Sequence, residues 1–294
     1  MELARGLMNS EPIKPTQIKP TQIKPAQTKP TKIRQAQVRQ VVEARGFDWY
    51  YCEQTGSTNA DALQHHARHG RDVVVFGEAQ SAGRGRRGRQ WLSPFARNIY
   101  CTVGISREIP AARQGLLSIV TGVALCRALC AQTGLQVRLK WPNDLLLADD
   151  KLGGILIESR ALGVGHFFFA IGFGLNLMMS ADELAALDRP ATSLSQALRN
   201  DLGEDLDRSK LLVASIEAVT SAIRNFEIDA VAGLIDEFSD LDAYHQRKVE
   251  VISGEQRISG INRGIDEQGQ LRLETAQGIE LYAAAEISLR AVNA

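Results

Sequence analysis

The pattern of hydrophobic and polar positions changes along the chain. In residues 46–245, short β-branched runs alternate with longer apolar runs of helical length. From residue 248 the apolar positions alternate over short runs, which glycines interrupt at positions 254, 260, 264, 269 and 278. Mixed helices and strands followed by closely spaced strands predict an α+β region, then a small β-barrel or sandwich of roughly fifty residues.

The middle of the chain supplies the elements of that α+β region. Ser57, Thr58 and Asp61 form a helix start with Thr58 as the N-cap, and Gly70 is a stop signal. Further helices are predicted at residues 116–132, 184–187, 211–226 and 231–241. Strands are predicted at residues 73–76, 99–105, 137–139, 154–158 and 167–171. A Gly-Val-Gly turn joins the last two of these strands into a pair.

A five-residue repeat, Ile-Lys-Pro-Thr-Gln and its variants, fills residues 13–32. A proline at every fifth position removes a backbone donor each time and blocks a helix or a central strand. This pattern predicts an extended, solvated segment. Residues 33–45 can form one short basic helix, and we expect the folded part to begin near Gly46. The whole of residues 1–45 is then a disordered basic leader, with an electrostatic tether to nucleic acid or an acidic partner as the alternative.

Charge is balanced over the chain but uneven along it. The formal net charge is zero, while residues 1–45 hold nine Lys or Arg against three Glu. The zero total argues against a general nucleic-acid binder. No apolar run reaches the roughly 18 residues of a membrane span, and the N-terminus lacks an apolar signal-peptide core. We expect a cytoplasmic protein without membrane contact, whose four cysteines are free thiols because none has Cys-x-x-Cys spacing.

The most informative segment is residues 83–91, Gly-Arg-Gly-Arg-Arg-Gly-Arg-Gln-Trp. Its arginines repel one another unless an anion lies among them. Its glycines allow the backbone to approach a ligand closely. Guanidinium groups and backbone N–H groups together predict an anion-binding loop. An RGG-type nucleic-acid segment is the alternative, although this copy is single and lies inside a folded pattern.

A second basic segment, Lys-Trp-Pro-Asn-Asp at residues 140–144, ends a predicted strand. Lys140 can meet a phosphate, Asn143 a phosphate or ribose, and Asp144 a Mg²⁺ ion, while a plain Pro-Asn-Asp turn is the alternative. Lys151 precedes a Gly-Gly pair, where two backbones can approach closely. Together with the glycine-arginine loop, these residues predict a pocket for a nucleotide and an acidic small molecule.

Other recognisable sites are weak or missing in the sequence. Asn176 follows a Gly-Phe-Gly-Leu strand end and can bind a nucleotide or belong to a turn. His65 and His69 lie four residues apart without an acidic or cysteine partner, which favours a solvated helix face over a zinc site. The sequence contains no P-loop motif and no plausible Ser-His-Asp arrangement.

Taken in order, these motifs resemble those of the biotin–protein ligase family. The resemblance runs from about residue 47 to residue 290, and the pairing of residues 83–91 with residues 140–144 makes it specific. It implies an α+β fold: a mixed-sheet catalytic domain of the biotin/lipoate ligase type over residues 46–245, followed by a small SH3-like β-barrel over residues 246–294.

The resemblance also implies roles for single residues. Biotin binding is implied for Ser57, Thr58, Asn59, Gln80, Gly83, Arg84, Gly85, Arg86 and Lys151. ATP binding is implied for Arg89, Trp91, Lys140, Asn143 and Asn176. A catalytic part is implied for Lys151, Arg86 and Asp144, and Asp144 would either ligate a metal or orient a lysine.

Members of this family adenylate biotin with ATP and pass the biotinyl group to one lysine of a carboxylase. The resemblance therefore implies a biotin–acetyl-CoA-carboxylase ligase that uses ATP, biotin and Mg²⁺. Its protein partner would be the biotin carboxyl carrier domain of a carboxylase, and a homodimer is left open. A lipoate or octanoyl ligase or transferase, which shares the fold, and a nucleic-acid-binding regulator are the alternative functions.

Some bacterial relatives carry an N-terminal winged helix that represses the biotin operon. Here only about 45 residues precede the expected core, and they hold the Pro-Lys repeat. We therefore expect a ligase that lacks the repressor domain and does not bind a specific DNA sequence.

Overall fold

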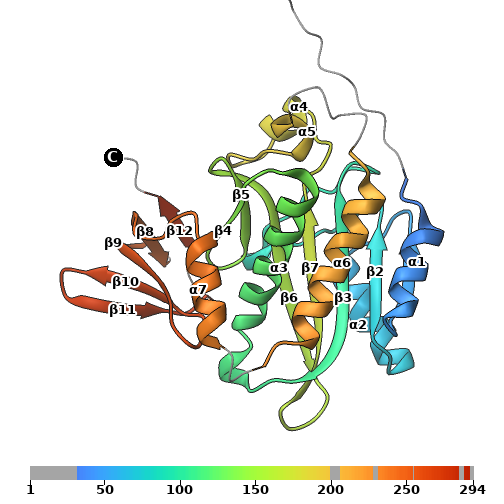
Figure 1. The fold of residues 1–294 in the computed structure, drawn as a ribbon, viewed down its shortest axis with the longest axis horizontal. Coiled ribbons are helices and arrows are strands. Elements are labelled where there is room, and N and C mark those ends of the chain that lie inside the picture. Colours follow the sequence, from blue (N-terminus) through green and yellow to red (C-terminus); the bar gives the residue numbers. More distant parts are fainter. Residues whose placement is uncertain (1–31, 199–205, 228–230, 254, 285–287, 292–294) are drawn as a thin grey trace, which may run out of the picture.

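Residues 32–198, 206–227, 231–253, 255–284 and 288–291 are described by a computed structural model of the protein. Their strands form two separate sheets, a larger one from the middle of the chain and a smaller one from its end (Figure 1). This arrangement confirms the expected α+β fold with a small all-β unit at the end of the chain.

The larger sheet takes its strands from β1 (Asp48–Cys52), β2 (Val73–Gly77), β3 (Ile99–Glu108), β4 (Val137–Lys140), β5 (Asp144–Leu147), β6 (Asp150–Ala161) and β7 (His166–Leu175). The smaller sheet takes them from β8 (Lys248–Ser253), β9 (Gln256–Ile265), β10 (Leu271–Thr275), β11 (Gly278–Tyr282) and β12 (Ser288–Ala291). The helices of the described residues are α1 (Gln35–Ala44), α2 (Thr58–His69), α3 (Leu116–Thr133), α4 (Ala181–Ala185), α5 (Leu194–Ala197), α6 (Arg208–Arg224) and α7 (Val231–Leu241), with short 3₁₀ turns at Arg86–Gly88 and Ala111–Arg113.

The larger sheet is mixed, as the sequence predicts. Its strand order is β1-β2-β3-β7-β6-β5-β4, with β1 parallel to β2 and all other neighbours antiparallel. The smaller sheet is antiparallel in the order β11-β10-β9-β8-β12. Figure 1 shows α3 and α6 running side by side across the larger sheet, with α1 beyond α6 and the smaller sheet at the opposite end of the molecule.

Alternating residues of β2 serve two hydrophobic cores, because successive strand side chains point to opposite faces. Val74 and Phe76 belong to the main core, which also contains residues of α1, α3 and α6. Val73 and Val75 belong to a small second core with Ala62 of α2. Both faces of this sheet are therefore covered, which explains why β2 is apolar at every position.

Helix α3 is long and apolar enough to be mistaken for a membrane-spanning segment, although none is expected from the sequence. By length and composition, residues 111–133 could cross a membrane, the one such stretch among the described residues. Eleven residues of α3 are buried, and the helix packs against α6, β4 and β6. The apolar character of this helix is thus accounted for by its place in the core.

The predicted start of α2 is wrong by one residue. Ser57, not Thr58, is the N-cap, and no side chain caps the helix by a hydrogen bond. Thr58 is the first helical residue, and its backbone N–H donates to Gln80 Oε1 instead. The predicted stop at Gly70 is confirmed, since Gly70 takes the left-handed conformation with φ of 64°.

Three short elements were not predicted, and one was misplaced. These are β1, β5 and α5, each four or five residues long. The helix expected at residues 184–187 lies earlier, at Ala181–Ala185, because Ser180 and Glu183 form a reciprocal capping box at its start. The proline repeat up to residue 31 lies outside the described residues.

The folded region begins before Gly46, which corrects the expected leader boundary. Val38 and Val42 of α1 are fully buried in the main core. Arg45 forms an ion pair with Glu217 of α6, with Nη2 and Oε1 2.6 Å apart. The apolar positions of this segment have helical spacing, so α1 can bury one face against α6 even though residues 32–45 as a whole are basic. The boundary between the two folded units near residue 245 stays a prediction.

Trp141 joins the two sheets. Its side chain is 1% exposed, and its Nε1–H donates to the carbonyl oxygen of Gly269, in the β9–β10 turn, over 3.0 Å. Ala243 N–H donates to Leu139 O over 2.7 Å close by, after the end of α7. The end of β4 is therefore bonded to the smaller sheet through Trp141, and to the segment that leads into that sheet through Leu139.

We expect Trp141→Phe to lower the free energy of unfolding by about 1–3 kcal/mol, because it leaves a buried carbonyl without its donor. Trp49→Phe is the matched control, since the buried Nε1 of Trp49 makes no hydrogen bond within the described residues. Urea unfolding of both variants measures the difference. Equal losses of stability in the two variants would show that the Gly269 bond contributes nothing.

Candidate active site

A cavity of about 540 Å³ lies where several segments of the larger sheet converge. Its walls come from the start of α2, the loop after β2, the β4–β5 turn, β6, β7, and the segment between α4 and α5. Leu289 of β12 also lines it. The volume is in the range of pockets that enclose small ligands.

The structure brings together all the predicted site residues except Gly83. The cavity is lined by Ser57, Thr58, Asn59, Gln80, Arg84, Gly85, Arg86, Arg89, Trp91, Lys140, Asn143, Asp144, Lys151 and Asn176. Gly83 has a structural place instead: a Cβ there would lie 2.7 Å from the carbonyl oxygen of Trp91. This glycine lets the loop close on itself, with Trp91 N–H donating to Gly83 O over 2.9 Å.

One half of the cavity is polar and uncharged. The side chain of Gln80 accepts from the backbone N–H of Thr58 at 3.0 Å and donates to Ser93 Oγ at 3.1 Å. Thr102 of β3, which the sequence did not indicate, lies with its Oγ1 2.7 Å from Asn59 Oδ1. Each of these side chains is held in one orientation by another, so this wall is preorganised for a neutral hydrogen-bonding ligand.

Arg84 and Arg86 tie the loop to other segments of the cavity. Arg84 forms an ion pair with Glu158 of β6, with Nη2 and Oε2 3.0 Å apart. Arg86 Nη1 donates to Asn143 Oδ1 over 3.1 Å, which ties the loop to the β4–β5 turn. The side chain of Asn143 is itself fixed by β6, because its Nδ2 donates to Ile155 O over 2.7 Å.

Arg86 retains capacity for an anion. Its Nη2 is buried and makes no hydrogen bond to any residue that the structure describes. Burial lowers the pKa of this guanidinium, because desolvation disfavours the charged form. A negatively charged ligand in the cavity would satisfy the buried nitrogen and offset the cost of burying the charge.

Two lysines flank one carboxylate on the other side of the cavity. Lys151 Nζ lies 2.5 Å from Asp144 Oδ1, and Lys140 Nζ lies 4.0 Å from Asp144 Oδ2. The Lys151 ammonium also lies 5.3 Å from the centre of the Trp91 ring. Asp144 and Trp91 therefore fix the position of the lysine charge.

Glycines on β6 and β7 allow these side chains to lie against the sheet. A Cβ on Gly174 would lie 2.6 Å from Trp91 Nε1, and a Cβ on Gly172 would lie 2.2 Å from Asn59 Oδ1. A Cβ on Gly154 would lie 3.3 Å from Lys151 Nζ. The Gly-x-Gly spacing of β7 thus has a steric reason, namely close approach of site side chains to the backbone, whereas a Cβ on Gly153 would lie 2.8 Å from the carbonyl oxygen of Gly174.

Asn176 is 4% exposed, and its Nδ2 donates to Thr192 O over 3.1 Å. Thr192 N–H in turn donates to the carbonyl oxygen of Lys151 over 3.0 Å. Arg189, which sequence reasoning missed, lines the cavity from the same segment. Arg189 belongs to no recognisable sequence motif, and only the fold brings it to the same cavity as the other basic residues.

No group of three or more His, Cys, Asp or Glu that could hold a metal ion occurs among the described residues. Asp144 is flanked by lysines, so this carboxylate is suited to a metal only where the ligand supplies the other oxygens. His65 does not face solvent as expected: its Nε2 lies 2.9 Å from Asp48 Oδ2, and its side chain is 18% exposed. All four cysteines are free, as predicted.

Comparison with known proteins agrees with this geometry. Residues 51–176 match the model of the biotin/lipoate A/B protein ligase family, and residues 245–290 match that of the biotin protein ligase C-terminal domain. The chain belongs to this family. The first match covers the glycine-arginine loop, both lysines and Asn176, and the second covers most of the smaller sheet.

The chain is similar to several curated ligases. It is 39% identical over 221 residues to the bifunctional ligase/repressor BirA of Escherichia coli, which covers 75% of this chain and 67% of that protein. It is 35% identical over 245 residues to the biotin–(acetyl-CoA-carboxylase) ligase of Mycobacterium tuberculosis, covering 80% and 86%. The chain thus spans about two thirds of the length of BirA and 86% of the length of the Mycobacterium tuberculosis ligase.

Solved structures show the same fold. The biotin protein ligase of Aquifex aeolicus, in complex with biotin and ATP, matches with a TM-score of 0.68 at 24% identity. The match covers 83% of this chain and 99% of that one. The mixed-sheet ligase fold with an SH3-like C-terminal unit is therefore confirmed.

Proposed function

We propose that the protein is a biotin–acetyl-CoA-carboxylase ligase that forms biotinyl-5′-AMP and transfers biotin to a carrier lysine. The observation that supports this most is the division of one cavity into a neutral hydrogen-bonding half and a strongly basic half. The ureido ring of biotin suits the wall around Thr58, Asn59 and Gln80. The triphosphate of ATP suits the half around Arg86, Lys140 and Lys151.

In the first step an oxygen of the biotin carboxylate attacks the α-phosphorus of ATP. A new O–P bond forms, the bond from phosphorus to the β-phosphate bridge breaks, and pyrophosphate leaves. Two anions must approach each other, so the reaction needs fixed positive charge at the point where they meet. Lys151, oriented by Asp144, and Arg86 with its buried Nη2 supply that charge in our proposal.

Arg89, Trp91, Asn143 and Asn176 would bind the remainder of ATP, and Arg189 adds a further positive charge. We propose that Mg²⁺ enters with ATP, with most of its ligands from phosphate and water. Asp144 could then contact the metal or only orient Lys151, and its short distance to Lys151 favours the second role.

In the second step the ε-amine of the carrier lysine attacks the acyl carbon of biotinyl-5′-AMP. An amide bond forms, AMP leaves with the electron pair of the C–O bond, and the amine loses a proton. The partner in this proposal is the carrier domain of a carboxylase. In this proposal the glycine-arginine loop covers the bound adenylate and excludes water, which would otherwise hydrolyse the mixed anhydride. A cytoplasmic location stays a prediction of the sequence.

Pyrophosphate release that requires biotin, ATP and Mg²⁺ together, with biotinyl adenylate detected by mass spectrometry, would support this proposal. Leaving out each component in turn provides the controls. A parallel reaction with lipoate separates the two activities of the wider family. An adenylate formed with lipoate but not with biotin would overturn the biotin assignment.

We expect Lys151→Met to slow adenylation by about 10²–10³-fold, because it removes a charge directed at the transition state. Lys248→Met, at an exposed position of β8, is the matched control and should keep the wild-type rate. Single-turnover formation of the adenylate measures both. A rate for Lys151→Met within a factor of two of wild type would remove this residue from the reaction.

We expect Arg86→Ala to release biotinyl adenylate roughly tenfold faster, because one charge-assisted contact to the anion and the Asn143 tie are both lost. The released adenylate should then biotinylate lysines of an unrelated protein, detected by blotting. Arg272→Ala, on the exposed side of β10, should behave as wild type. Labelling that stays confined to the carrier domain would contradict the expected role of Arg86.

A further inference from the structure

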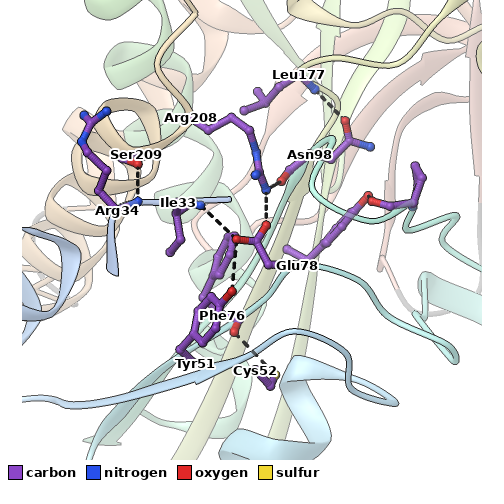
Figure 2. A network of polar contacts seen from close by, with 12 residues as sticks. Ile33, Arg34, Tyr51, Cys52, Phe76, Glu78, Asn98, Leu177, Arg208 and Ser209 are labelled. Carbon is purple, nitrogen blue, oxygen red and sulfur yellow. Dashed lines mark hydrogen bonds and ion pairs between the residues drawn. The ribbon is translucent and has the colours of Figure 1, made fainter. Parts of the chain in front are cut away.

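A buried ion pair lies outside the lining of the cavity. The side chains of Glu78 and Arg208 are 0% and 2% exposed, and Arg208 Nη2 lies 2.8 Å from Glu78 Oε2 (Figure 2). The other carboxylate oxygen, Oε1, accepts the backbone N–H of Ile33 at 3.0 Å and lies 3.5 Å from Tyr51 OH. The pair thus connects the start of α6, the end of β2, β1 and the segment before α1.

Net stability is a poor reason for this pair. Removing two charges from water is costly, and a buried ion pair often contributes no more than an apolar pair of the same volume. Nothing in the proposed reaction uses either group directly, since neither lines the cavity. A role in arrangement is a better explanation, because Glu78 lies two residues before Gln80 and Arg208 is linked through Asn98 to the residue that follows Asn176.

The first of these segments leads to the neutral half of the cavity. Glu78 lies two residues before Gln80, whose side chain holds Thr58. The backbone of Glu78 is bonded on both sides: its N–H donates to Cys52 O over 3.0 Å, and its carbonyl oxygen accepts from Ala96 N–H over 3.0 Å. The Glu78 side chain therefore anchors the strand end from which Gln80 projects.

The second segment leads to the basic half of the cavity. Arg208 Nη2 also donates to the carbonyl oxygen of Asn98 over 2.6 Å. The side chain of Asn98 accepts the backbone N–H of Leu177 at 2.9 Å, and Leu177 follows Asn176 directly. Figure 2 shows this chain of contacts running from Glu78 through Arg208 and Asn98 to Leu177.

We infer that Glu78 and Arg208 are positioning residues that hold Gln80 and Asn176 at a fixed separation. The backbone N–H of Ile33 completes the arrangement, so the segment before α1 contributes to the site without touching the ligand. This inference rests on the proposed function, because it assigns Gln80 to biotin and Asn176 to ATP. Loss of the pair should therefore weaken the binding of both substrates.

The first test is Glu78→Gln. Glutamine keeps the side-chain shape, but it has only one acceptor oxygen, so it cannot accept from Arg208 and Ile33 on separate oxygens as Glu78 does. We expect KM for biotin and KM for ATP each to rise roughly tenfold, with kcat changed much less, because displacement of binding groups weakens capture of substrate. The matched control is Val219→Ala on the same helix as Arg208, where Val219 is fully buried. It should lower Tm while both KM values stay at the wild-type level, with all variants assayed equally far below their Tm.

The second test separates positioning from stability. The double variant Glu78→Gln/Arg208→Met removes both charges and should regain Tm relative to Glu78→Gln, because no unpaired charge stays buried. Its KM values should stay raised, since the bond from Arg208 to Asn98 is missing. If Glu78→Gln alone fails to fold, the KM values of this double variant still test the inference.

The third test addresses the segment before α1. Ile33→Pro removes the N–H that Glu78 accepts, whereas Ile33→Val keeps it and loses only one methylene. We expect a severalfold rise in both KM values for Ile33→Pro and none for Ile33→Val.

Wild-type KM values in the double variant or in Ile33→Pro would overturn the inference while the wild-type protein remains an active ligase. Raised KM values in Val219→Ala, matched for Tm, would also overturn it, because a general loss of stability would then explain the effect. A wild-type protein that forms no biotinyl adenylate would overturn the proposed function, and this inference with it.

Discussion

Close approach of two side chains to one strand is the constraint on which the site depends. Asn59 and Trp91 both lie against β7, and only the missing Cβ atoms of Gly172 and Gly174 leave room for them. The two glycines are two residues apart and so share one face of the sheet. The start of α2 and the end of the glycine-arginine loop are therefore seated side by side. Lys151 then takes its place over the Trp91 ring.

That packing determines how charge is distributed in the cavity. With Trp91 against the sheet, Lys151 has Asp144 on one side and an aromatic face on the other, so its ammonium cannot move far without losing both. Arg86 is held by Asn143, the residue directly before Asp144. The two cations come from segments about sixty residues apart, yet each is positioned by a polar partner of the β4–β5 turn. Electrostatic stabilisation of a reaction between two anions requires such preorganised charges.

Much of this arrangement could be predicted, and the errors have physical causes. Long apolar elements such as α3 and β3 followed from the length and composition of their apolar runs, and the motif residues that line the cavity followed from their chemistry and from the family resemblance. Arg189, which lines the cavity, and Thr102, which bonds to the cavity residue Asn59, carry no local pattern, so only the tertiary fold brings them to the site. The leader boundary was wrong because basic composition concealed a buried face on α1, where Val38 and Val42 meet the core.

Residues of a single motif divide between ligand binding and the scaffold. In the β4–β5 turn, Asn143 and Asp144 present polar atoms to the cavity, whereas Trp141 donates its indole N–H to the C-terminal unit. The C-terminal unit in turn places Leu289 in the cavity wall. The same turn therefore carries site residues and the contact that docks the smaller sheet. A change that loosened this docking would alter the cavity wall and the turn together, so the smaller sheet is part of the site.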